Sequence, residues 1–179
     1  MGRDRWVRGR ATEEAGVVVA NEKGISDANL EVKWRFYEKE GLSFAIKPGL
    51  TAPTGDENKG LGAGKIGYSA YFITTKETDP WAFHLNLGYR RNENKADERK
   101  DLLHVSLATE FEARKDLKLV ANVGFESNPD NTANTDPAFA LGGVIYSIKE
   151  NLNIDFGLKM GLNKAELDYS LLAGLAYKF

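Results

Sequence analysis

The sequence contains no cysteine in 179 residues and no run of eighteen apolar residues. The first absence excludes a disulfide framework and a thiolate metal site. The second excludes a transmembrane helix, which needs about 20 mostly apolar residues. Histidine occurs twice and the net charge is -2, so nothing indicates a nucleic-acid partner. None of these absences excludes a membrane β-barrel, whose strands are only half apolar and whose loops are charged.

What the sequence does contain is a two-residue alternation of apolar and polar side chains, most regular at the C-terminus. On a strand, successive side chains point to opposite faces, so one face of the last segment is continuously apolar. Its members are Tyr169, Leu171, Ala173, Leu175, Tyr177 and Phe179. A soluble protein seldom ends on an exposed aromatic residue in an apolar strand. A transmembrane barrel does so naturally because lipid solvates its outer face.

Nine such segments are predicted as strands, and the connections between them alternate between tight and long. The strands are residues 28–38, 42–54, 63–76, 81–91, 102–113, 117–127, 137–148, 152–162 and 169–179. The long connections are Gly55–Gly62, Asn92–Asp101, Asn128–Asp136 and Asn163–Asp168. Repeated antiparallel hairpins of this kind predict an all-β, up-and-down transmembrane β-barrel. About eleven residues at ~3.3 Å each, tilted by about 40°, also match the thickness of a bilayer.

The domain organisation is expected to be simple, with a poorly defined segment at residues 1–23 and a barrel at 24–179. Residues 15–20 are a weak candidate for one further strand. Bacterial single-chain barrels have an even number of strands and keep both termini on the periplasmic side. We therefore expect the chain to be part of a larger even-stranded barrel, with further strands and an export signal upstream.

One segment is similar to a known family of outer-membrane proteins. Its turn comprises Pro53, Thr54, Gly55 and Asp56, and a glycine element follows at Gly60, Leu61 and Gly62. These residues, with Gly24–Asp27 before them, resemble the MetA-pathway of phenol degradation family. The resemblance implies an outer-membrane channel for small molecules, aromatic or hydrophobic ones among them. The terminal strand likewise resembles the signal read by the barrel assembly machinery, carried here by Tyr169, Leu171, Leu175, Tyr177 and Phe179.

If the apolar faces meet lipid, the opposite faces line a lumen that carries charges of both signs. The lumen-lining candidates are Glu31, Lys33, Arg35, Lys47, Lys65, His84, Arg90, Glu110, Glu112, Lys118, Glu126, Asp155 and Lys159. A ring of one sign would predict ion selectivity. A mixture predicts either a weakly selective polar lumen or an internal salt-bridge network. Charge alone does not decide whether solutes pass through the lumen or whether its own side chains fill it. The family resemblance favours the passage of solutes.

Two other functions are compatible with the same pattern of residues. A soluble, lipocalin-like barrel that binds a small hydrophobic ligand has the same alternation with its apolar face turned inward. A lipid hydrolase of the outer membrane is suggested by the pair His104 and Ser106. However, Glu110 lies ~20 Å further along that strand, too far to orient His104.

The sequence therefore predicts a channel rather than an enzyme, with no catalytic residue, no metal and no cofactor. Its expected location is the bacterial outer membrane. Its expected partners are outer-membrane lipid, the barrel assembly machinery and a small solute, without nucleic acid. Gly55–Gly62 and Asn128–Asp136 are the connections expected to fold over the mouth.

Overall fold

A computed structural model describes residues 13–14, 17–18 and 23–177. Their strands are β1 (Glu13–Glu14), β2 (Val17–Val18), β3 (Ala28–Glu31), β4 (Trp34–Lys39), β5 (Leu42–Ala52), β6 (Gly67–Thr78), β7 (Trp81–Arg91), β8 (Asp101–Arg114), β9 (Leu117–Glu126), β10 (Ala138–Lys149), β11 (Leu152–Gly161) and β12 (Tyr169–Tyr177). A single 3₁₀ turn, η1 (Glu57–Lys59), is the one helical element in these residues. No helix in the described part of the chain is long and apolar enough to cross a membrane.

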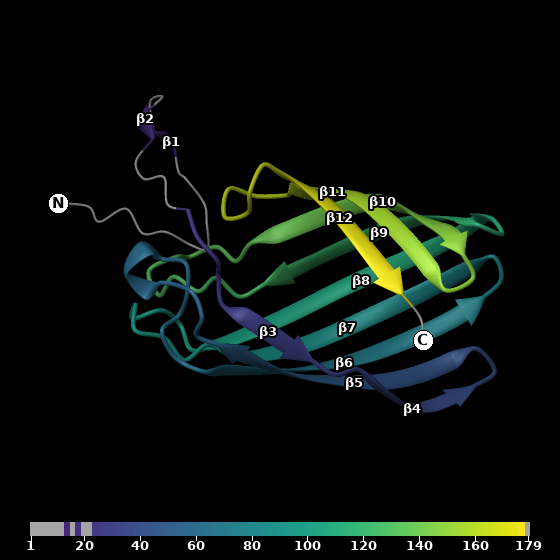
Figure 1. Cartoon of the computed structure of the whole chain (residues 1–179), viewed down its shortest axis with the longest axis horizontal. Coiled ribbons are helices and arrows are strands. Elements are labelled where there is room, and N and C mark those ends of the chain that lie inside the picture. The colour runs from purple at the N-terminus through teal and green to yellow at the C-terminus, as the bar shows by residue number, and fades with distance from the viewer. Residues whose placement is uncertain (1–12, 15–16, 19–22, 178–179) are drawn as a thin grey trace.

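Strands β3 to β12 form one antiparallel sheet that curls into a half-barrel (Figure 1). From β5 to β12 each strand pairs with the next one in sequence, while β3 and β4 both pair with β5. Among the described residues, β12 and the β3–β4 segment are the two edges of the sheet. The predicted all-β, up-and-down architecture is confirmed.

The predicted alternation of connections is confirmed as well. Each tight connection has two residues, at 40–41, 79–80, 115–116 and 150–151. The long connections are L1 (residues 53–66), L2 (92–100), L3 (127–137) and L4 (162–168). The long ones gather at one end of the half-barrel and the tight ones at the other (Figure 1).

The predicted strand at 28–38 is wrong in one respect, because a bulge interrupts its regular alternation. Arg35 lies opposite Ala45, but the next paired residue, Tyr37, lies opposite Phe44. One extra residue, Phe36, is inserted, which is a β-bulge that reverses the alternation beyond it. Glu38 therefore shares a face with Arg35, and the two form an ion pair at 3.2 Å.

The start of β6 and the N-terminal segment also differ from the sequence prediction. Strand β6 begins at Gly67 rather than residue 63, because Gly64 takes a left-handed φ of 68° in L1. Near the N-terminus, β1 pairs with β2 in a separate two-stranded sheet and not with the large one. The rest of residues 1–22 lie outside the described residues.

The two faces of the large sheet differ sharply in side-chain character. On the convex face large apolar side chains are exposed, for example Leu107 at 54%, Val123 at 50% and Phe156 at 58%. On the concave face the side chains crowd together, and Ala45, Ile73, Ser106 and Phe139 are buried there. The apolar side of each strand is thus turned outward and the mixed polar side inward.

The tight turn between β4 and β5 offers a test of the backbone geometry. Glu40 and Gly41 both have positive φ, 51° and 72°, as a type I′ hairpin requires. A Cβ on Gly41 would lie 2.5 Å from the carbonyl oxygen of Glu77. We expect Gly41→Ala to lower the free energy of unfolding by about 1–2 kcal/mol, measured by urea titration of the folded protein. Glu40→Gly is the matched control, and its free energy of unfolding should equal that of the wild type or slightly exceed it. If Gly41→Ala is as stable as the wild type, the type I′ turn with a positive φ at Gly41 is contradicted.

Candidate functional site

The concave face is organised around three short ion pairs near the end that carries the long connections. Lys47 Nζ donates to Glu31 at 2.8 Å, Arg90 Nη2 to Glu126 at 2.5 Å, and Lys159 Nζ to Glu166 at 2.9 Å. Each pair joins different elements: β5 with β3, β7 with β9, and β11 with L4. Each cation is therefore neutralised next to a carboxylate. Five of the lumen candidates, Glu31, Lys47, Arg90, Glu126 and Lys159, are thus held in ion pairs.

Between these pairs, a row of stacked side chains crosses the concave face. Lys47 Nζ lies 4.6 Å from the centre of the Tyr71 ring, and Tyr71 lies edge-on to His104 at 5.7 Å. His104 stacks on Phe139 at 6.4 Å, and Lys159 Nζ lies 4.7 Å from the centre of the Phe139 ring. We call Lys47, Tyr71, His104, Phe139 and Lys159 the aromatic row. The sequence analysis singled out its two lysines and His104 but not Tyr71 and Phe139, because the register between strands is not visible in a single strand's alternation.

His104 and Ser106 do meet, as their spacing predicts. His104 Nε2 lies 3.2 Å from Ser106 Oγ, and Asn86 Nδ2 donates to the same oxygen at 3.2 Å. Ser106 is only 3% exposed and lies on the concave face. The hydroxyl is thus held inside the wall of the sheet and away from the apolar, exposed side.

At the tight-turn end, a second polar cluster surrounds Glu110. His84 Nε2 lies 3.6 Å from one oxygen of Glu110, and Lys118 Nζ donates to the other at 3.1 Å. His84 Nδ1 lies 2.9 Å from the hydroxyl of Thr75. His84, Glu110 and Lys118 line a cavity of about 330 Å³ together with Glu112, which lies opposite Lys118 in register. The partner of Glu110 is therefore His84 on the neighbouring strand, which reasoning along one strand missed.

The remaining lumen candidates do not join these clusters. Lys33 lies in the break between β3 and β4, and Lys65 lies in L1. Arg35 pairs with Glu38, and both side chains are more than half exposed. Asp155 lies opposite Gly174 near the tight-turn end of β11 and β12. That the candidates line a passage stays a prediction.

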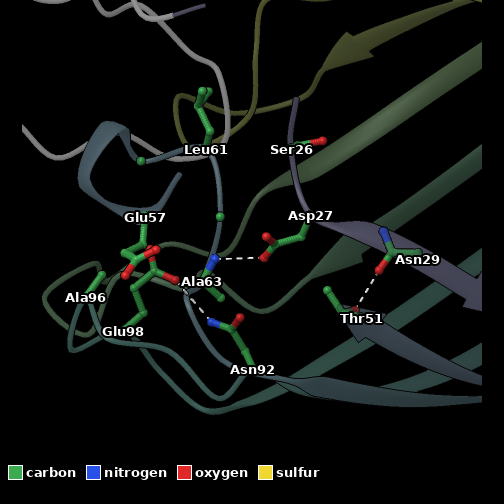
Figure 2. Close-up of a pocket in the computed structure, with 12 residues that line it drawn as sticks. Ser26, Asp27, Asn29, Thr51, Glu57, Leu61, Ala63, Asn92, Ala96 and Glu98 are labelled. Atoms are coloured by element: carbon green, nitrogen blue, oxygen red, sulfur yellow. Dashed lines mark hydrogen bonds between the residues drawn. The ribbon is translucent and has the colours of Figure 1, made fainter. Parts of the chain in front are cut away.

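At the end of the half-barrel that carries the long connections, the side chain of Asp27 joins the two ends of L1. Asp27 Oδ1 accepts a hydrogen bond from Gly55 N at 2.9 Å, and Oδ2 accepts one from Ala63 N at 2.7 Å. Figure 2 shows Asp27 reaching from the strand entrance toward Ala63, beside a cavity of about 120 Å³. Thr54 adds a third link, because its hydroxyl accepts from Ala28 N at 2.9 Å and donates to Ser26 O at 3.2 Å. We call these contacts the Asp27 clamp.

The clamp explains the glycine-rich spacing of the segment after Pro53. A Cβ on Gly62 would lie 2.3 Å from Asp27 Oδ1, and a Cβ on Gly55 would lie 2.4 Å from Leu61 O. Asp56 caps η1 by accepting from Asn58 N, and Gly60 ends it with a φ of 69°. Each residue of the segment therefore has a structural role in closing L1 against Asp27.

The turn and glycine residues that close L1 against Asp27 are the ones that resemble the phenol-degradation family in the sequence. Residues 4–179 match the family described as "Putative MetA-pathway of phenol degradation". The chain belongs to this family. No curated protein matches the chain. For this member of the phenol-degradation family, the Asp27 clamp supplies a physical reason for the Pro-Thr-Gly-Asp and Gly-Leu-Gly segments.

In this phenol-degradation family member, each long connection is also tied to the next. Lys95 Nζ of L2 donates to Glu57 of L1 at 2.6 Å. Arg99 N donates to Pro129 O at 2.7 Å, and Asn131 Nδ2 donates to Asp97 O at 2.7 Å, which joins L2 to L3. Asn163 Nδ2 of L4 donates to Asp136 O of L3 at 2.9 Å. The long connections thus form one linked collar.

The first link of the collar predicts a pH dependence. The hydrogen bond from Lys95 holds the pKa of the Glu57 carboxyl below its ordinary value. Because the folded-state pKa is lowered, the link stabilises the collar above the ordinary pKa of glutamate. That contribution is lost as the pH falls through the lower, folded-state pKa. We expect Lys95→Met to raise the Glu57 pKa in an NMR titration of its carboxyl carbon, whereas Lys59→Met should not; a Glu57 pKa that Lys95→Met leaves unchanged would contradict the link.

The described residues contain no group of three or more histidine, aspartate or glutamate side chains placed to hold a metal ion. Glu31, Glu110, Glu126 and Glu166 on the concave face instead form ion pairs with lysine, arginine or histidine. This arrangement presents a polar wall to solutes on the inside of the half-barrel, and the ion pairs neutralise much of the charge of that wall.

Proposed function

We propose that this family member is an outer-membrane β-barrel channel for the passive passage of small molecules, aromatic or hydrophobic ones among them. The observation that carries the proposal is the orientation of the two faces. The convex side exposes large apolar residues from β6 to β12, and the concave side holds paired charges. Monomeric soluble proteins rarely expose apolar patches of more than a few hundred Å². Lipid would cover this face, and the long connections would lie outside.

The mechanism would be diffusion past the concave wall, without a chemical step or a cofactor. Lys47, Arg90, Lys118 and Lys159 are each paired with a carboxylate there, which weakens the field of either sign that a solute would meet. The family name refers to phenol degradation and is compatible with an aromatic solute. The barrel assembly machinery would read β12, whose Tyr169, Leu171, Leu175 and Tyr177 are exposed. Phe179, the last residue of the predicted signal, lies outside the described residues.

The two alternatives fit the geometry less well. A lipocalin-like barrel would turn the apolar face inward around its ligand, whereas here that face points outward. A lipid hydrolase would need its nucleophile within reach of lipid, whereas Ser106 is buried on the concave side. The contact between His104 and Ser106 is thus on the face that the proposal turns away from lipid.

The proposal is tested by fractionation and by transport. We expect the full-length gene product in the outer-membrane fraction, with a mobility shift between boiled and unboiled samples on a detergent gel. Proteoliposomes should then swell in isotonic arabinose faster than empty liposomes. A protein that stays soluble without detergent would refute the membrane assignment. A folded membrane protein that gives no swelling would refute the channel.

A further inference from the structure

The aromatic row defined above crosses the concave face without a gap. Its members come from β5, β6, β8, β10 and β11, and four consecutive contacts of 4.6–6.4 Å join them. No other set of described ring contacts spans as many strands on this face. The row therefore forms a band across the inner wall of the half-barrel.

The rings of the row lie over glycines of the strands between them. A Cβ on Gly88 of β7 would lie 2.4 Å from Cε1 of Tyr71 and 3.1 Å from Cβ of His104. A Cβ on Gly124 of β9 would lie 2.7 Å from both Cβ of Ser106 and the carbonyl oxygen of Val105, and 2.9 Å from Cζ of Phe139. Such distances fall below the contact range of 3.4–4 Å, so these neighbours can occupy their positions only because the Cβ atoms are absent. At Gly88 the neighbour is the Tyr71 ring, whereas at Gly124 it is first the backbone and Ser106 of β8.

The two ends of the row are fixed by carboxylates. Glu31 holds the ammonium group of Lys47, and Glu166 holds that of Lys159. Each lysine is therefore confined between a carboxylate and a ring. Phe139, near one end, is only 9% exposed, so its ring belongs to the wall and offers no open stacking surface. These contacts hold the row in a fixed position on the inner wall.

We propose that the aromatic row is the size-determining constriction of the lumen, and that Gly88 is a positioning residue that sets its width. The inference rests on the proposed function, since it requires solutes to pass the concave side. Adding a Cβ at Gly88 would move the Tyr71 ring by about 1 Å to reach ordinary contact. That Cβ would lie between the ring and the backbone of β7, so the ring is displaced away from the wall and into the lumen. Passage of solutes close to the limiting size then falls first.

The test compares swelling rates of proteoliposomes in arabinose and in the larger raffinose. We expect Gly88→Ala to lower the raffinose-to-arabinose ratio about threefold or more. Adding Tyr71→Leu to Gly88→Ala should restore the ratio because no ring is left to displace. The matched control is Gly142→Ala on the convex face, where a Cβ would meet nothing within 4 Å, and it should keep the wild-type ratio.

The outcomes separate the constriction from the channel. If the wild-type protein admits arabinose and Gly88→Ala keeps its ratio, the constriction is refuted and the channel stands. If the folded wild-type protein admits neither sugar, the proposed function fails and the inference fails with it. If Gly88→Ala does not fold, as shown by loss of the gel shift, Tyr71→Leu alone decides: it should raise the ratio, and an unchanged ratio refutes the constriction.

Discussion

Replacing Leu107 by arginine is expected to lower the free energy of unfolding in phospholipid vesicles by about 2–4 kcal/mol. Leu107 lies near the middle of β8 and is 54% exposed on the convex face. Its register partners, Leu85 and Val123, are exposed there as well. If lipid covers this face, the guanidinium group would sit near the bilayer midplane, where a charge is most costly. If water covers it, a surface substitution should change stability by no more than about 0.5 kcal/mol.

The measurement is a urea titration of vesicle-folded protein, followed by tryptophan fluorescence. Asn134→Arg is the matched control, because Asn134 is an exposed residue of L3 and the same charge there should be tolerated. Equal stability of the two variants would argue that the convex face meets water. That result would remove the main support for the channel and favour a soluble role.

The second large effect is expected from Asp27→Ala, which removes both acceptors of the Asp27 clamp. A hydrogen bond to a charged group contributes about 1.5–3 kcal/mol, so the amides of Gly55 and Ala63 should lose about 3 kcal/mol of protection. Their hydrogen exchange should accelerate about a hundredfold, since each 1.4 kcal/mol corresponds to a factor of ten. L1 would then open without unfolding of the sheet.

A graded control comes from the same position. Asp27→Asn keeps one carbonyl acceptor in the same place, so one of the two amides should stay protected. The amide of Ser147, which bonds to Asp116 O at 2.8 Å at the far end of the half-barrel, should exchange at its wild-type rate in both variants. Acceleration at Ser147 as well would show global unfolding and not the release of a clamp.

Much of this fold could be predicted from the sequence because alternation and turn residues are local signals. Strand 81–91 was predicted with the bounds that β7 has, and the tight and long connections fall where polar residues interrupt the pattern. The bulge at Phe36 could not be predicted, since an extra residue in a strand leaves the local composition unchanged. It becomes visible only against its partner, β5.

The candidate site was harder to predict because its contacts join residues that are far apart in the sequence. Lys47 and Glu31 are 16 residues apart, and Asp27 and Ala63 are 36 apart. Charge type alone identified most of the paired residues but not their partners. Tyr71 and Phe139 carry no charge and read as ordinary strand aromatics, so only the register places them over Gly88 and Gly124.

The linked collar has a consequence for recognition by antibodies or other large ligands. Because L1 to L4 are joined in series, the surface they present at that end is assembled from several distant parts of the chain. A binder selected on the folded protein would contact a discontinuous epitope, and its binding should be lost on denaturation. A linear peptide copied from a single connection would reproduce little of that surface.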